Sequence, residues 1–151
     1  MKNLKRGLLL LLGIFILIQF WRPQKNVSAD KVVTDFENET RPSEEVGAIL
    51  RQNCYDCHSN NTVYPWYAEV APISLWIDGH VEEGKEHFNV SEWATWDMEK
   101  KDHKMDELIE EVAEGHMPEN SYTWMHGKLS EDEKEKLVAW GKNVRAELTK
   151  K

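Results

Sequence analysis

The sequence predicts an all-α fold, in which one small helical domain follows an N-terminal hydrophobic segment. Apolar residues recur at helical spacing in several stretches of the 151-residue chain, and helix-start signals precede two of them. No stretch shows the alternating pattern of a half-buried strand. We therefore divide the chain into a signal or anchor segment (residues 1–29), a polar linker (30–42) and a helical domain (43–151).

The N-terminal segment has the pattern of a targeting sequence. Basic residues Lys2, Lys5 and Arg6 precede residues 8–20, which are apolar except for Gly13 and Gln19. We expect an uncleaved anchor in the cytoplasmic (inner) membrane, with the domain in the periplasm. The alternative is cleavage after Ala29, because Val27, Ser28 and Ala29 are small enough for a cleavage site.

Four helices are predicted in the domain. The first starts at residues 42–45 and carries Val46, Ile49 and Leu50 on one face. The second opens at Pro72 and ends near Gly84. The residues expected to point inward on this second helix are Ile73, Trp76, Ile77, His80 and Val81.

The last two helices have clear end signals. The third is predicted over residues 97–114 and stops at Gly115, a usual residue after a helix C-terminus. The fourth begins at Ser130 and Glu133, which form a capping box. The apolar stripe of this last helix consists of Leu137, Trp140, Val144 and Leu148.

The motif Cys54-Tyr55-Asp56-Cys57-His58 points most directly to function. Cys-x-x-Cys-His is the attachment pattern of a c-type haem, in which two thiols bind the two vinyl groups and the histidine binds the iron. A thioredoxin-like pair would need a βαβ context, and a zinc site would need a second pair of ligands. A structural disulfide would not require the histidine. We therefore expect one haem c per chain, held covalently by Cys54 and Cys57, with His58 as the proximal iron ligand.

The sixth iron ligand is predicted in the turn after the third helix. Met117 lies there between Gly115 and Pro118, and a rigid turn is suited to presenting a thioether. Methionine also fills gaps in protein cores. The alternative ligands are His116, His126, His80 and Met125.

The charge of the chain restricts its partners. All 27 acidic residues but only 14 of the 19 basic residues follow residue 29, so that part has a formal net charge of −13. This charge argues against nucleic acid as a partner. It suits a basic redox partner protein, although a well-solvated surface explains it equally well.

Several motifs together resemble a known family. In chain order they are residues 54–62, residues 64–67, residues 71–74, His80 with Glu83 and Gly84, Asn89 with Ser91 and Trp93, Met117 with Pro118, Tyr122, His126, and the closing helix from Leu129 to Trp140. Over about residues 43–146 the chain resembles the bacterial haem-binding domain family, which is related to cytochrome c. The resemblance implies a cytochrome-c-like fold, covalent haem through Cys54 and Cys57, His58 as proximal ligand and Met117 as distal ligand.

The function expected from these features is electron transfer by a membrane-tethered, single-haem cytochrome with His/Met ligation. It is an electron carrier rather than an enzyme, because no distal acid–base pair is evident in the sequence. The alternatives are a haem-based sensor or binding module, and a peroxidase-like enzyme with a displaceable sixth ligand.

We also expect the Nδ1 atom of His58 to donate a hydrogen bond to a proline carbonyl, that of Pro72 in preference to that of Pro65.

Overall fold

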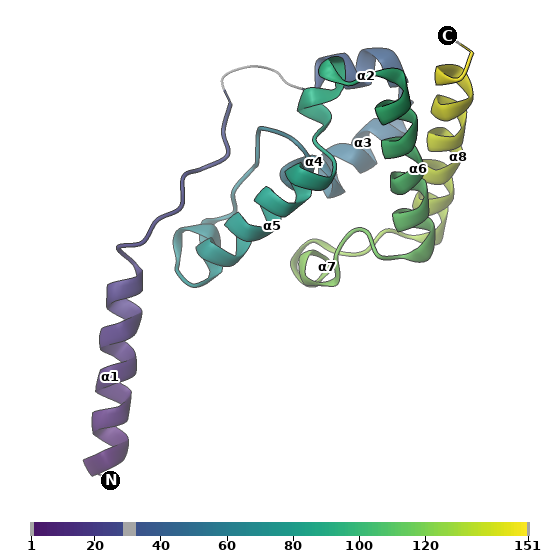
Figure 1. Ribbon diagram of the computed structural model, residues 1–151. Coiled ribbons are helices and arrows are strands. Elements are labelled where there is room, and N and C mark those ends of the chain that lie inside the picture. Colours follow the sequence, from purple (N-terminus) through teal and green to yellow (C-terminus); the bar gives the residue numbers. More distant parts are fainter. Residues whose placement is uncertain (1, 29–32, 151) are drawn as a thin grey trace.

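The computed structural model describes residues 2–28 and 33–150, and every regular element within them is a helix (Figure 1). The elements in chain order are α1 (Lys2–Ile18), α2 (Thr34–Thr40), α3 (Glu44–Asn53), α4 (Tyr55–His58), η1 (Trp66–Glu69), α5 (Ile73–His87), η2 (Val90–Thr95), α6 (Met98–Glu114), α7 (Asn120–His126) and α8 (Glu131–Leu148). In the described part an isolated bridge between Val27 and Asn61 is the one β-type pairing. The all-α prediction is confirmed.

Side-chain caps explain where three of the helices begin. The Ser43 side chain accepts a hydrogen bond from the Val46 amide at the start of α3, and the Asp97 side chain does the same for Lys100 in α6. The predicted capping box of Ser130 and Glu133 is present at α8. Gly115 ends α6 in the left-handed conformation (φ 78°), as predicted.

The core is an aromatic cluster closed by the C-terminal helices. Phe36 and Trp93 are fully buried, and their ring centroids lie 5.0 Å apart in an edge-to-face arrangement. Trp140 of α8 packs on Phe36 from another side. The four predicted stripe residues of α8 are all buried. The core therefore brings together α2, η2 and α8, which are far apart in the sequence.

Helices α6 and α8 form an antiparallel pair along one side of the domain (Figure 1). Gly141 of α8 lets Ile109 approach closely, because a Cβ at this glycine would lie 2.8 Å from the Ile109 Cγ1 atom. At the far end of the pair, Arg145 donates hydrogen bonds to both carboxylate oxygens of Asp102, at 2.8 and 3.0 Å. Apolar packing and this bidentate ion pair together fix the two helices.

The prediction of an N-terminal membrane anchor is wrong. In the described residues, no helix has both the length and the apolar character needed to cross a membrane. Helix α1 is 17 residues long and includes three basic residues at its start. At 1.5 Å per residue it reaches about 26 Å, short of the roughly 30 Å of a bilayer core. The predicted localisation, a single anchor in the inner membrane with the haem domain in the periplasm, rested on this segment and is not supported.

The chain after α1 packs on the helical domain instead of leaving it. We call residues 19–28 the strap. Gln19 exchanges two hydrogen bonds with the backbone of Ala71, at 2.9 and 3.0 Å, and Asn26 bonds to residues 59–64. The fold class with a separate hydrophobic segment is therefore corrected to a helical domain that takes in nearly the whole chain. The alternative cleavage site at Ala29 lies outside the described residues.

Two regions differ from the predicted helices. Helix α2 lies within the range predicted as linker, and its Phe36 is central to the core. In α5, Val81 is buried as predicted, but Ile73 and Trp76 are exposed. Ile73, Trp76 and His80 follow one another at helical spacing, so they form a stripe beside the buried face of α5.

Candidate haem-binding site

The attachment motif occupies one helical turn. Cys54 is both the C-cap of α3 and the N-cap of α4, and its carbonyl accepts hydrogen bonds from the amides of Cys57 at 3.2 Å and His58 at 3.0 Å. Residues three and four positions apart in a helix lie on one side. The turn therefore presents both sulfurs and the imidazole on the same side, as attachment of one porphyrin requires.

Burial raises the pKa of both cysteine thiols. No disulfide joins Cys54 to Cys57. Burial raises the pKa of Cys54 to about 12, with a smaller contribution from Cys57. Burial, then Asp56 and Glu119, raise the pKa of Cys57 to about 11. A thioredoxin-like pair needs a lowered thiol pKa, so this alternative does not fit.

The imidazole of His58 is held by a backbone carbonyl. Its Nδ1 atom lies 2.8 Å from the carbonyl oxygen of Phe88, so the predicted acceptors Pro72 and Pro65 are wrong. Burial lowers the pKa of His58, which favours the neutral ring. A neutral ring that donates from Nδ1 carries its lone pair on Nε2, the atom suited to bind iron.

Helix α5 packs directly against the attachment motif at Gly84. A Cβ at this position would lie 2.8 Å from the Cys57 carbonyl oxygen and 3.0 Å from the Cys57 Cβ. Only glycine fits this approach without movement of one backbone. The C-terminal end of α5 thereby reaches α4 and leads into Phe88, whose carbonyl holds His58.

Met117 makes no hydrogen bond to a residue of the attachment motif within the described part of the chain. It follows Gly115 in the turn between α6 and α7, its side chain is 37% exposed, and its amide donates to the Glu111 carbonyl. No hydrogen bond or ring contact between described residues joins Met117 to α4. Its turn is tied to α5 instead, through the 2.9 Å contact of the Glu119 carboxylate with the His80 Nδ1 atom.

The other candidate ligands have partners of different kinds. His116 is exposed, beside Glu111 and Glu114 at 3.5 and 3.4 Å. His126 stacks on Tyr122 with ring centroids 4.1 Å apart and lies 3.2 Å from the Tyr67 hydroxyl. Met125 is exposed. Among the described residues, no group of three or more acidic, cysteine or histidine side chains is placed to hold a metal ion.

The comparison with known families assigns the chain to a family. A family model described as "Haem-binding domain" matches residues 13–143. The chain belongs to the haem-binding domain family. The match includes the last third of α1 (residues 13–18) and the whole strap, which packs on the domain. No curated protein and no solved structure matches the chain.

The residues of this haem-binding domain fit a haem. The two thiols and the fixed imidazole are the donor set that a c-type haem uses. Large apolar side chains are exposed on α5 (Trp76), in the turn before α7 (Met117) and on α7 (Trp124 and Met125). In the described residues, the buried nitrogens His80 Nε2 and Trp96 Nε1 have no hydrogen-bond partner.

Several residues of the site could not be found from the sequence. Phe88 contributes a carbonyl, which has no side-chain signature. Asn26 lies in the range predicted as targeting segment, yet it bonds to the loop after His58. Gly84 carried one usable signal, because a glycine inside a helical pattern often marks a close approach.

Proposed function

We propose that this haem-binding domain is a c-type cytochrome that transfers electrons through one covalently attached haem. Cys54 and Cys57 attach the haem, His58 is the proximal iron ligand and Met117 is the distal one. The single observation that carries the proposal is the α4 turn, with two thiols beside an imidazole whose Nδ1 is fixed. When bound, the haem supplies a one-electron redox couple.

The protein side of the attachment needs no oxidant. On a bound haem, each cysteine S–H would add across one vinyl double bond, so that a carbon–sulfur bond would form and the proton would pass to the neighbouring vinyl carbon. Cys54 and Cys57 form no disulfide, so both thiols can take part. His58 then stays beside the ring, because residues 57 and 58 are adjacent.

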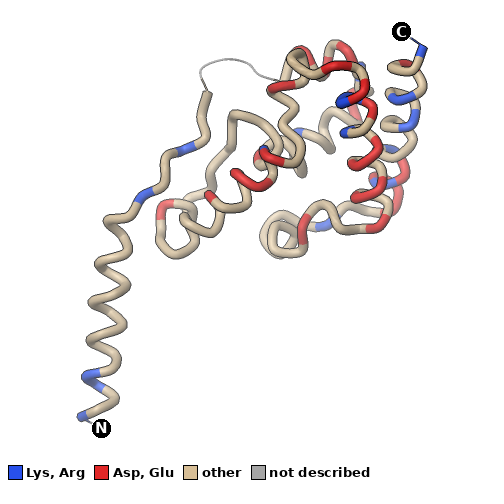
Figure 2. Tube along the Cα trace, in the orientation of Figure 1, with Lys and Arg blue, Asp and Glu red and all other residues tan. Residues whose placement is uncertain are grey.

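A redox partner with a basic surface suits this protein. Acidic side chains are spread over the helical domain, while basic residues are prominent on α1 and the strap (Figure 2). Opposite charge speeds the encounter of two proteins. The same acidic surface disfavours nucleic acid as a partner.

A peroxidase-like enzyme is the second candidate, and the pair of His80 and Glu119 favours it. A histidine that donates from Nδ1 to a carboxylate carries its lone pair on Nε2, and the Nε2 atom of His80 is buried without a partner among the described residues. Such a group can accept a proton from a bound substrate. In this reading Met117 is not an iron ligand, and its turn leaves the sixth position open.

Carbon monoxide binding to the reduced protein separates the two candidates. For the electron carrier we expect no binding in the wild type and binding in Met117→Ala, because the thioether closes the iron. Met125→Ala is the matched control and should behave as the wild type. Immediate binding by the wild type, together with rapid turnover of hydrogen peroxide that His80→Ala abolishes, would favour the enzyme.

A further inference from the structure

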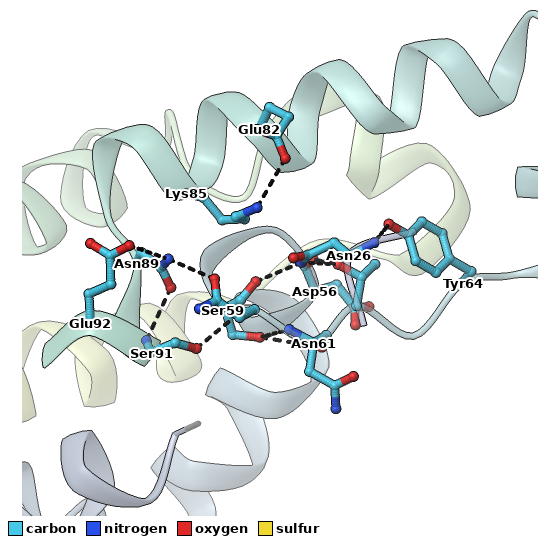
Figure 3. Close-up of polar contacts among 12 residues, drawn as sticks. Asn26, Asp56, Ser59, Asn61, Tyr64, Glu82, Lys85, Asn89, Ser91 and Glu92 are labelled. Carbon is cyan, nitrogen blue, oxygen red and sulfur yellow. Dashed lines mark hydrogen bonds and ion pairs between the residues drawn. The ribbon is translucent and has the colours of Figure 1, made fainter. Parts of the chain in front are cut away.

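We propose that the strap is part of the haem site and that its residue Asn26 positions the proximal ligand His58. This proposal rests on the proposed function, because it takes His58 as the iron ligand. A chain of hydrogen bonds leads from the strap to the imidazole, and Figure 3 shows its part between Asn26, the loop after the attachment motif, and Asn89 with Ser91.

Asn26 is bonded to the loop after the attachment motif at four points. Its side-chain amide donates to the Ser59 carbonyl at 2.8 Å and to the Thr62 hydroxyl at 2.9 Å. Its backbone amide donates to the Tyr64 hydroxyl at 2.9 Å, and its carbonyl accepts from the Thr62 amide at 2.9 Å. One strap residue thus binds both ends of residues 59–64.

The same loop is bonded back to the attachment motif. The Ser59 hydroxyl donates to the Tyr55 carbonyl at 2.7 Å, and the Thr62 hydroxyl donates to the Asp56 carbonyl at 2.6 Å. The Asp56 carboxylate accepts from the Val63 amide at 3.0 Å. Movement of the loop therefore acts on the α4 turn that carries the cysteines and His58.

On its other side the loop is bonded to the segment that carries the Phe88 carbonyl, the hydrogen-bond acceptor of His58 Nδ1. Asn60 accepts a hydrogen bond from the Asn89 side chain at 2.9 Å, and the Asn60 amide donates to the Ser91 hydroxyl at 2.9 Å (Figure 3). Residue 89 follows Phe88 directly, and the Phe88 carbonyl accepts from His58 Nδ1. Asn26, through the loop, thus fixes both the ligand and the carbonyl to which it is bonded.

The rest of the strap keeps Asn26 in place. Gln19 is bonded to Ala71 in both directions, and Arg22 and Lys25 form ion pairs with Glu69 of η1. The Ser28 amide donates to the Asn60 carbonyl at 2.9 Å. The strap is therefore bonded to the domain before, at and after Asn26.

This arrangement has an electronic consequence for a bound iron. A hydrogen bond from the other ring nitrogen raises the basicity of a histidine ligand, and a more basic ligand favours the oxidised metal. If Asn26 no longer holds the loop, the contact between His58 and Phe88 loosens. The reduction potential should then rise, even where the haem remains attached.

The test compares Asn26→Ala with Asn61→Ala. Asn61 lies in the same loop, and its side-chain amide has no hydrogen bond to a described residue (Figure 3). We expect a higher reduction potential for Asn26→Ala than for the wild type. We also expect the Nδ1 proton of His58 in the reduced protein to exchange with water about five-fold faster by NMR, the factor that the net loss of one typical hydrogen bond gives. Asn61→Ala should match the wild type in both measurements.

Ser91→Ala provides a second variant at the other end of the network, in case Asn26→Ala does not fold. It removes the acceptor of the Asn60 amide and should shift the potential and the proton exchange in the same direction. Wild-type values for both Asn26→Ala and Ser91→Ala, or equal shifts in Asn61→Ala, would overturn the proposal. These results are distinct from failure of the proposed function, in which the wild type itself would carry no covalent haem.

Discussion

Gly84 is the residue at which helix packing reaches the attachment motif. Its absent side chain lets α5 lie against the backbone of Cys57, so the helix sets the position of a thiol and, through Phe88, of the imidazole. Because the contact is with backbone atoms, neither partner can relieve a clash by changing rotamer.

We predict that Gly84→Ala destabilises the protein by about 1–3 kcal/mol, the usual cost of overpacking. Gly79 lies in the same helix, and a Cβ there would have no neighbour within 4 Å. Gly79→Ala should therefore stabilise the protein by about 0.5–1 kcal/mol, because alanine is the better helix former. Urea unfolding measures both changes. Equal effects of the two substitutions would show that α5 does not press on Cys57.

At the scale of elements, the pair of α6 and α8 forms one side of the domain. The contribution of its Arg145–Asp102 ion pair to stability depends on pH. The hydrogen bond from Arg145 lowers the pKa of Asp102 below its ordinary value of 3.8. A lowered folded-state pKa means that the charged carboxylate stabilises the fold above about pH 4. This contribution is lost as the pH falls through the folded-state value.

We predict that Asp102→Asn lowers the free energy of unfolding at pH 7 by at most about 1 kcal/mol, since both partners are partly exposed. The difference from the wild type should disappear as the pH falls well below 3.8. Glu110→Gln is the control on the same helix, because Glu110 forms no ion pair with another described residue. Urea midpoints between pH 7 and pH 3 measure the effect, and a difference that persists at low pH would contradict it.

The elements that the sequence predicted are those with local signals. Helices α6 and α8 have side-chain caps, and the stripe of α8 is long enough to show its period. Helices α2 and α7 are seven residues long and begin without a side-chain cap, so no local pattern marks them. Contacts with distant residues hold these two helices in place. In α2, Phe36 packs on Trp93, and in α7 the Tyr122 hydroxyl donates a hydrogen bond to the Gln52 carbonyl.

In the candidate site, too, only the residues that form a local sequence pattern could be predicted, and the residues that distant contacts bring in could not. The spacing of Cys54, Cys57 and His58 is a local pattern with a chemical cause. The acceptor of His58 lies 30 positions away in a backbone carbonyl, and Asn26 lies 33 positions from Ser59. No single-sequence pattern reports such contacts. The apolar run of residues 8–20 misled the prediction of an anchor, because its composition resembles a membrane helix but its length does not suffice.

At the scale of the whole molecule, the chain after residue 29 is strongly acidic. The part after residue 29 carries a formal net charge of −13, and Figure 2 shows acidic residues over most helices of the domain. Fields of this size act over about 10 Å at 0.1 M salt and less at higher salt. Association with a redox protein should therefore depend on the sign of that protein's charge.

We predict that a basic redox protein exchanges electrons with this haem-binding domain faster than an acidic one of similar potential. The rate with the basic protein should fall as sodium chloride is raised from 10 to about 500 mM, since salt screens the attraction. Stopped-flow measurement of the second-order rate constant tests this. A rate that rises with salt for the basic protein would show that charge does not steer the encounter.

Covalent attachment of haem by Cys54 and Cys57 is the central claim, and the intact mass of the unfolded protein tests it most directly. The protein is produced together with a haem-attachment system, unfolded in acid and extracted to remove any haem held without a bond. We predict that the wild type has the mass of the chain plus one haem, and that the Cys54→Ala/Cys57→Ala variant has the mass of the chain alone. His58→Ala tests iron ligation separately. A wild-type chain that loses all haem on extraction would contradict the account.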